Sequence, residues 1–251
     1  MASDKRFAVL IDADNVSAKY IRFIFNEIAN DGLATYKRIY GDWTCGNLAP
    51  WKAVLLENSI TPIQQYAYTS GKNATDSAMI IDAMDILYSG SVEGFCIVSS
   101  DSDFTRLAAR LRESGMCVVG MGEKKTPQPF VKACDRFRYL EVLASEEREN
   151  EAAEEKEPQE GRGEQKPQEM TSMKTIKKAI ATVISENSDE DGWVLTAQVG
   201  NVLTKRFPDF DVRNFGFKKF TPFIKSLNMF EIRSERRKDG TTQYWIKMKE
   251  R

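Results

Sequence analysis

Short apolar runs alternate with amphipathic segments over the first 144 residues of the chain. The runs are rich in Val, Ile, Phe and Tyr, as buried strands are, and the segments between them repeat apolar residues every three or four positions, as helices do. Expected strands are 7–12, 34–40, 60–68, 95–98 and 116–121, and expected helices are 17–30, 48–57, 76–88 and 104–113. Strands that alternate with helices predict an α/β fold with a parallel, doubly wound sheet flanked by helices.

Residues 171–251 show a second pattern, in which helical spacing gives way to two short strands. Expected helices are 173–184, 196–203 and 217–227, and expected strands are 230–233 and 243–248. Thr196 is the expected N-cap of the second helix. Asp239 and Gly240, between the two strands, are typical of a hairpin turn. Three short helices and a hairpin predict a small winged helix-turn-helix domain.

The residues between these two patterns differ from both in composition. Residues 145–170 contain 10 Glu against 4 Lys and Arg and almost nothing apolar, so burial cannot offset the entropy of ordering them. They are expected to form an acidic linker, either disordered or helical with fraying ends. The predicted domains are therefore 1–144 and 171–251, joined by the linker 145–170.

The charge of the chain is unevenly distributed, although the formal net charge is only −1. Residues 1–144 have a net charge of −1, residues 145–170 of −6 and residues 171–251 of +6. A basic second domain favours a polyanionic partner. No apolar run approaches the roughly 18 residues of a membrane span, and the first residues lack the apolar core of a secretory signal. A cytoplasmic protein without a membrane partner is expected.

Histidine is absent from the chain, which excludes His-based triads, His-ligated zinc and His general bases. The four cysteines include no C-x-x-C pair, so buried free thiols are expected rather than disulfides or a zinc site. Any hydrolysis by this chain must therefore activate water with a metal ion or with a carboxylate.

Carboxylates follow two of the predicted buried strands. Asp12 ends the first strand, and Asp101 and Asp103 follow the fourth, at the edge where open α/β sheets bind ligands. If these strands are neighbours, their acids converge and need either a cation or a bound proton. Asp76 lies at the start of a helix on its apolar stripe, where it either caps the helix N-terminus or joins the other acids around a metal.

Other charged residues near this edge have two interpretations each. The loop 122–129 leaves the same end of the sheet, so Lys124 and Lys125 either contact a phosphate chain or form ordinary soluble surface. Asp82 and Asp85 lie on the polar flank of the helix that begins near Asp76, and they are expected to be structural or solvated.

Three motifs resemble those of the NYN branch of the PIN-like nucleases, the group that includes the LabA-like proteins. They are Ile11–Asn15, Lys72–Asp76 and Ser99–Phe104, in this order and at strand ends or a helix start. The resemblance implies a metal-dependent endoribonuclease, with single-stranded RNA the favoured substrate and Lys72 an RNA contact. It also implies Mg²⁺ or Mn²⁺ as the cofactor, with Asn15 orienting Asp12 or the metal's water. The implied metal ligands are Asp12, Asp76, Asp101 and Asp103.

Residues 192–194, 207–211 and 214–220 resemble an OST-HTH (LOTUS) domain. The resemblance implies binding of RNA or of a partner protein. The basic residues expected to contact the RNA backbone are Lys218, Lys219, Lys225, Arg236, Arg237 and Lys238. A solvated basic surface is the alternative. No aromatic platform for RNA bases is expected, because the aromatic residues of this domain fall at core spacing.

Two other functions are compatible with the sequence. Residues 48–57 contain Glu57 as their only acid, whereas many PIN nucleases carry a further acid on the corresponding helix. One alternative is therefore an adaptor with an NYN fold that binds RNA or a protein without cutting. The other is a phosphatase of the haloacid dehalogenase type, because Asp12–Val16 also fits a D-x-D-x-V nucleophile loop. The chain between Asp12 and Asp101 leaves no evident cap for such an enzyme.

Overall fold

The computed structural model of the chain describes residues 5–66, 74–145, 171–189, 191–236 and 240–249. The chain divides into two compact units, Met1–Glu169 and Met170–Arg251. Apart from Ser145, the predicted linker 145–170 lies outside the described residues. Within those ranges, no helix has the length and the apolar character needed to cross a membrane.

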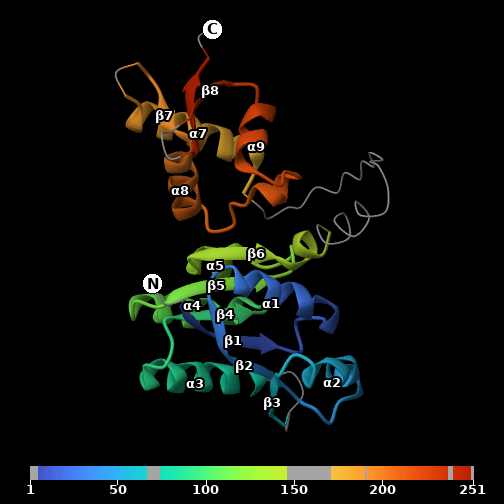
Figure 1. Cartoon of the computed structure of the whole chain (residues 1–251). Helices are drawn as coiled ribbons and strands as arrows, with labels where there is room; N and C mark the ends of the chain where they lie inside the picture. The colour runs from blue at the N-terminus through green and yellow to red at the C-terminus, as the bar shows by residue number, and fades with distance from the viewer. Residues whose placement is uncertain (1–4, 67–73, 146–170, 190, 237–239, 250–251) are drawn as a thin grey trace. The chain divides into compact units, whose positions relative to one another are not determined.

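The first unit is built on a six-stranded parallel sheet in the order β3-β2-β1-β4-β5-β6 (Figure 1). Its strands are β1 Arg6–Asp12, β2 Leu33–Gly41, β3 Thr61–Gln64, β4 Gly94–Val98, β5 Cys117–Gly122 and β6 Arg136–Tyr139. Its helices are η1 Ala18–Tyr20, α1 Ile21–Ala29, η2 Gly46–Leu48, α2 Ala49–Leu55, α3 Ala74–Ser89, η3 Ser102–Phe104, α4 Thr105–Glu113 and α5 Gln128–Ala133, followed by helical residues 140–145. The predicted parallel α/β sheet is therefore confirmed.

The strand order brings the ends of β1 and β4 together at the centre of the sheet. β1 pairs with β2 on one side, where Asp12 lies opposite Tyr40, and with β4 on the other, where Ile11 lies opposite Val98. The chain runs outward from β1 to β3, returns to β4 and runs outward again to β6, so the strand order reverses between β1 and β4. Open α/β sheets bind ligands beyond the carboxyl ends of the strands at such a reversal.

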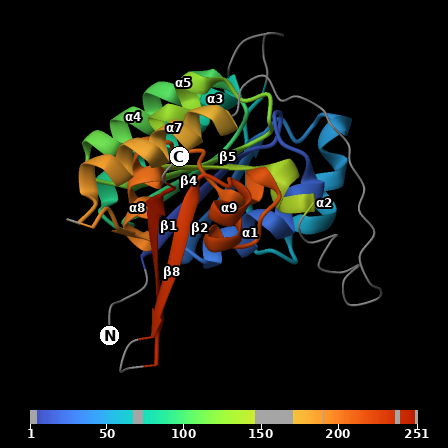
Figure 2. The same cartoon turned by 90° about the horizontal axis from the view of Figure 1, so that it is seen from above.

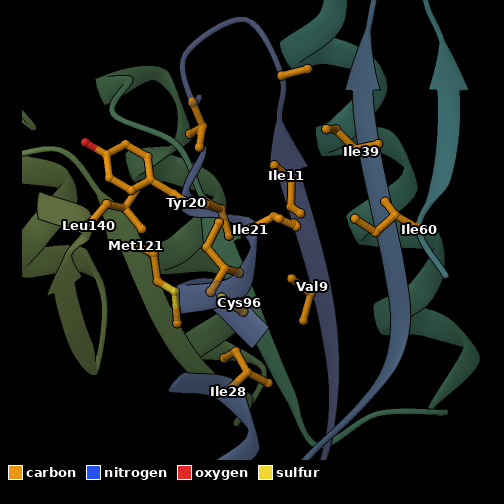
Figure 3. Close-up of a cluster of buried hydrophobic side chains, with 14 of the residues drawn as sticks. Val9, Ile11, Tyr20, Ile21, Ile28, Ile39, Ile60, Cys96, Met121 and Leu140 are labelled. Carbon is orange, nitrogen blue, oxygen red and sulfur yellow. The ribbon is translucent and has the colours of Figure 1, made fainter. Parts of the chain in front are cut away.

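Successive residues of β1 point to opposite faces of the sheet, and helices cover both faces (Figure 2). Ile11 packs with Ile21 of α1 in a buried hydrophobic cluster on one face (Figure 3). Asp12 follows Ile11 and therefore points to the other face, against which α3 packs. The same face carries Tyr40, the neighbour of Asp12 on β2, whose hydroxyl donates to Asp82 of α3.

The end of the first unit differs from the sequence-based expectation. The predicted loop 122–129 is shorter, because α5 begins at Gln128. α5 has 6 residues, too few to show a helical period in the sequence. β6 is an edge strand that ion pairs connect to α1 and to the turn after it, through Arg138 with Glu27 of α1 and Arg136 with Asp31 of the turn. These pairs join residues more than a hundred positions apart, so no local pattern in the sequence predicts them.

In the part of the second unit that the structure describes there are three α-helices and a three-stranded sheet in the order β7-β9-β8. Its elements are α7 Met173–Asn187, β7 Val194–Leu195, α8 Thr196–Arg206, η4 Val212–Phe215, α9 Phe220–Ser226, β8 Phe230–Arg236 and β9 Thr242–Met248. The predicted helix-turn-helix unit with its hairpin is confirmed. The prediction that Thr196 caps α8 is wrong, because Leu195 occupies the cap position and the Thr196 hydroxyl donates to the Tyr244 carbonyl at 2.6 Å. The unpredicted strand β7 makes this contact possible by pairing with β9.

Candidate active site

Asp12 is a fully buried carboxylate at the carboxyl end of β1. Its Oδ1 accepts hydrogen bonds from the backbone N–H groups of Asp14 at 3.1 Å and Asn15 at 3.2 Å. Its Oδ2 accepts from the Ser99 hydroxyl at 2.7 Å and from Asn15 Nδ2 at 2.9 Å. Burial raises the pKa of Asp12, and the hydrogen bonds from Ser99 and Asn15 partly oppose that rise. The protein therefore holds this carboxylate in one orientation.

Ser99 connects Asp12 to the acids that follow β4. Its hydroxyl accepts a hydrogen bond from the Asp101 backbone N–H at 3.0 Å while it donates to Asp12. The Asp101 side chain in turn caps η3 by accepting from the Asp103 backbone N–H at 2.9 Å. Asp101 is half-buried and Asp103 is exposed. The sequence identifies Ser99 only as part of a motif. Its position one residue beyond a buried strand is the sequence feature that could have indicated its hydrogen bond to Asp12.

Asp76 lies in the first turn of α3, and its side chain is buried. Burial is the main cause that raises its pKa to about 6, followed by the negative charges of the other acids. Those acids are Asp12, Asp101, Asp103 and Asp14, in decreasing order of effect. The fold therefore brings the four predicted acids from three separate segments close enough for one to change the protonation of another.

The acids do not form a complete metal-binding shell in this structure. Within the described residues, no three His, Cys, Asp or Glu side chains make a group that could hold a metal ion. One physical reason is that both oxygens of Asp12 already accept hydrogen bonds from the protein, which occupies most of the lone pairs of a carboxylate. The electrostatic interaction among the acids acts over a longer distance than metal coordination does.

Comparison with protein families assigns both units of the chain. Residues 6–141 match the NYN domain, and residues 171–241 match the OST-HTH/LOTUS domain. The chain belongs to the NYN domain family. The NYN domain is part of the PIN-like nuclease superfamily, so the two domains together indicate an RNA-related nuclease or RNA binder.

Comparison with solved structures finds similar chains. One of them is the crystal structure of a protein of unknown function from Vibrio parahaemolyticus RIMD 2210633, with 18% sequence identity and a TM-score of 0.46. The similarity covers 55% of this chain and 94% of that chain. No curated protein matches the chain. The NYN assignment therefore depends on the family match. The acids at the ends of the strands are consistent with it.

Asp82 and Asp85 of the NYN domain have different environments. Asp82 forms an ion pair with Arg38 and accepts a hydrogen bond from the Tyr40 hydroxyl. Burial and the bond to Asp82 raise the pKa of Tyr40, so its hydroxyl stays protonated. Asp82 therefore joins α3 to β2, whereas Asp85 is exposed on α3.

The predicted RNA-binding lysines of the NYN domain lie at its surface where they are described. Lys125 is two-thirds exposed, with 66% of its side chain accessible, and its Nζ lies 2.9 Å from Glu123 Oε2. Lys124 is exposed, and its backbone N–H donates to the Glu141 carboxylate at 3.0 Å. Lys72 lies outside the described residues. A contact with RNA stays a prediction for all three lysines.

The predicted basic residues of the OST-HTH domain are also at the surface. Lys218, Lys219 and Lys225 are exposed in and around α9, and Arg236 is exposed at the end of β8. Arg237 and Lys238 lie outside the described residues. The interaction of these residues with RNA stays a prediction.

Not every aromatic residue of the OST-HTH domain belongs to its core, contrary to the expectation from spacing. Phe210, Phe223 and Phe230 are in the buried cluster, but Trp193 lies outside it, with the Arg233 guanidinium 4.9 Å from its ring centroid. Tyr244 on β9 is 38% exposed. Strand alternation explains the position of Trp193, because a residue next to the buried Val194 points away from the core.

We expect Asp76→Asn to stabilise the protein at pH 7 without added metal and to leave its stability unchanged below pH 4. The folded state raises the pKa of Asp76 from 3.8 to about 6, so it binds a proton more tightly than the unfolded state does. The stability of the unaltered protein therefore falls as the pH rises from about 4 to about 6. The asparagine variant does not lose this stability, because asparagine does not ionise. The expected gain at pH 7 is roughly 1 kcal/mol, or about 2–4 °C in Tm.

Thermal unfolding in EDTA at several pH values measures this effect. Asp85→Asn is the matched control, because it removes the same charge from an exposed position on the same helix. The interpretation fails if the difference in Tm between the Asp76 variant and the unaltered protein is the same at pH 4 and at pH 7.

Proposed function

We propose that this protein is a metal-dependent endoribonuclease whose NYN domain cleaves single-stranded RNA at the acidic site. One observation carries the proposal: a buried carboxylate, Asp12, lies at the reversal of strand order together with Asp76, whose pKa is raised by burial and by the neighbouring acids. Like charges gathered in this way favour a bound cation. The NYN and OST-HTH family matches supply the connection with RNA.

The donors at this site fit Mg²⁺ or Mn²⁺ in chemical type, since hard divalent cations prefer carboxylate oxygens and water. The residues that would hold the ion are Asp12, Asp76, Asp101 and Asp103. When bound, the ion would activate water and stabilise the charge that develops on the phosphodiester. To bind the ion, the acidic side chains must move closer together than they are in this structure. Their attraction to the cation would offset the free-energy cost of that movement.

The protein itself positions the carboxylates and changes the protonation of one of them. Ser99 and Asn15 hold Asp12 from two sides, and Ser99 also fixes the backbone of Asp101. Outer residues of this kind orient the groups that bind a metal. Asp76 can hold a proton on its carboxyl group at mildly acidic pH when no cation is present, because its pKa is raised to about 6.

In the same proposal the OST-HTH domain binds the RNA or a partner protein and delivers the substrate. The exposed lysines near α9 would contact phosphates rather than read bases. The described residues that would do so are Lys218, Lys219, Lys225 and Arg236. On the NYN domain, Lys124 and Lys125 would contact the phosphate chain beside the acidic site.

The test is a cleavage assay with the full chain. End-labelled single-stranded RNA and single-stranded DNA of the same sequence are incubated with Mg²⁺, with Mn²⁺ or with EDTA. We expect cuts within the RNA in both metals and none in EDTA. RNA that stays intact in both metals, or cleavage that persists in EDTA, would contradict the proposal.

A second candidate, an adaptor that binds RNA without cutting it, is favoured by the absence of a metal-binding group among the described residues. An adaptor would bind RNA with the same affinity in Mg²⁺ and in EDTA and would show no change in Tm on metal titration. A nuclease of the proposed kind would be stabilised by Mg²⁺ or Mn²⁺, because the ion binds only the folded state. Neither family match supports the phosphatase alternative.

A further inference from the structure

A pocket of about 350 Å³ adjoins the acidic site, and the proposed function uses only two of its residues, Asn15 and Lys125. It lies beyond the carboxyl ends of β1 and β5, and its walls include Asn15, Asn47, Trp51, Glu123 and Lys125. Its volume is within the range of about 300–1,000 Å³ that is usual for small-ligand sites.

Two hydrogen bonds connect the walls of this pocket to the acids. Asn15 lines the pocket and donates from Nδ2 to Asp12 at 2.9 Å. On the other wall, the Glu123 backbone N–H donates to the Ser100 hydroxyl at 2.9 Å, next to Asp101. The walls of the pocket are therefore bonded to Asp12 and to Ser100, the residue before Asp101.

The chemistry of the pocket suits a nucleotide. Leu48 and Trp51 line the pocket but are only 2% exposed, so they leave little apolar surface for a base, and recognition depends on the polar residues of the pocket. Asn47 is exposed and brings an amide that both donates and accepts hydrogen bonds, as the edge of a base requires.

The cation at the rim of the pocket is held in place. Lys125 Nζ lies 2.9 Å from Glu123 Oε2, and the hydrogen bond with Glu123 raises the pKa of Lys125, which keeps the ammonium group charged. Two-thirds of the side chain is still accessible, so the ammonium can also contact a phosphate.

We infer that this pocket binds the nucleotide next to the phosphodiester at the acidic site, with Lys125 on its phosphate and Asn47 on the edge of its base. The inference rests on the proposed function, because it takes the acidic site as the place of the phosphodiester. It assigns to the NYN domain a selection among the bases that flank the cut. The OST-HTH domain is not required for this selection.

The test measures binding of the four ribonucleoside 5′-monophosphates to the full chain by calorimetry in EDTA, so that no cleavage is involved. Lys125→Met should weaken binding of all four about tenfold, as expected for removal of one charge-assisted hydrogen bond. Asn47→Ala should change the order of preference among the bases. Lys52→Met is the matched control, since Lys52 is exposed on α2 beside Trp51 but does not line the pocket. The Lys52→Met variant should bind the monophosphates as tightly as the unaltered protein does.

A double variant, Glu123→Gln with Lys125→Met, separates the loss of the ammonium from the exposure of the Glu123 carboxylate. It should bind as weakly as Lys125→Met alone. The inference is overturned if the double variant binds like the unaltered protein, if Lys52→Met loses as much affinity as Lys125→Met, or if no monophosphate binds. Absence of RNA cleavage with the expected pattern of monophosphate binding would instead overturn the proposed function and leave the nucleotide pocket standing.

Discussion

Asp12→Asn is expected to lower the rate of RNA cleavage by about 10³-fold or more, because it removes the most buried carboxylate of the acidic site. A metal ion typically supplies several kcal/mol of transition-state stabilisation, and each 1.4 kcal/mol is about tenfold in rate. Asparagine has nearly the same shape but no charge, so the cation would be bound more weakly and in a poorer position. The measurement is the single-turnover rate on labelled RNA at saturating Mg²⁺.

The fold should tolerate this substitution. The new amide would place an N–H₂ group where a carboxylate oxygen now accepts from Ser99 and Asn15. The Ser99 hydroxyl can turn to accept, and the Asn15 amide can turn its oxygen inward, so both contacts can be kept. Equal circular dichroism and a Tm within a few degrees of the unaltered protein would show that the loss of rate is not caused by unfolding.

Asp85→Asn is the control for charge, since it removes one carboxylate from an exposed position of the same domain. Its cleavage rate should be unchanged. Cleavage by Asp12→Asn within tenfold of the unaltered rate would mean that Asp12 is not part of the chemistry, and the proposed mechanism would have to be abandoned.

The second large effect is expected on RNA affinity. Neutralising Lys218, Lys219 and Lys225 together, each to Gln, should weaken binding of single-stranded RNA by about 10- to 100-fold at low salt. Removing one lysine–phosphate interaction also lowers the slope of log K against log salt by about 0.7 for a single strand. Removing three of them should therefore reduce the slope by roughly 2. Deleting residues 171–251 altogether should have at least the same effect.

Fluorescence anisotropy of labelled RNA at several salt concentrations measures both quantities. Lys174, Lys177 and Lys178 provide a matched control, because all three lie on α7 and their change to Gln removes the same charge from another part of the same domain. The role assigned to the lysines near α9 is wrong if the slope does not change, or if the control variant loses as much affinity. The OST-HTH domain would then act through a protein partner.

Much of the fold follows from local patterns that are strong in this chain. Buried strands such as Phe95–Val98 are continuous apolar runs, and helices such as Thr105–Glu113 carry apolar residues at regular spacing. The pattern failed where elements are too short for a period, as for α5 and β7. It also failed at Trp193, where one aromatic residue on the outer face of a small sheet looks in sequence like another core residue.

The acids were found from the sequence, but their geometry was not. Asp12 and Asp101 each follow an apolar run, so local pattern places each of them at a strand end. Whether those ends are neighbours depends on strand order, which is set by the packing of helices over both faces of the sheet. The same packing decides that Asp76 is buried beside them and that its pKa rises to about 6.

Local sequence patterns therefore determine the order of elements, the division into two domains and the kinds of donor at the strand ends. Three features depend on contacts between distant residues: the bond from Ser99 to Asp12, the ion pairs that hold β6, and the pocket beside the acids. Local patterns register the period of a helix or a strand, whereas such contacts join segments far apart in the chain. Their formation is decided by which faces pack together, and no spacing along the sequence records that choice.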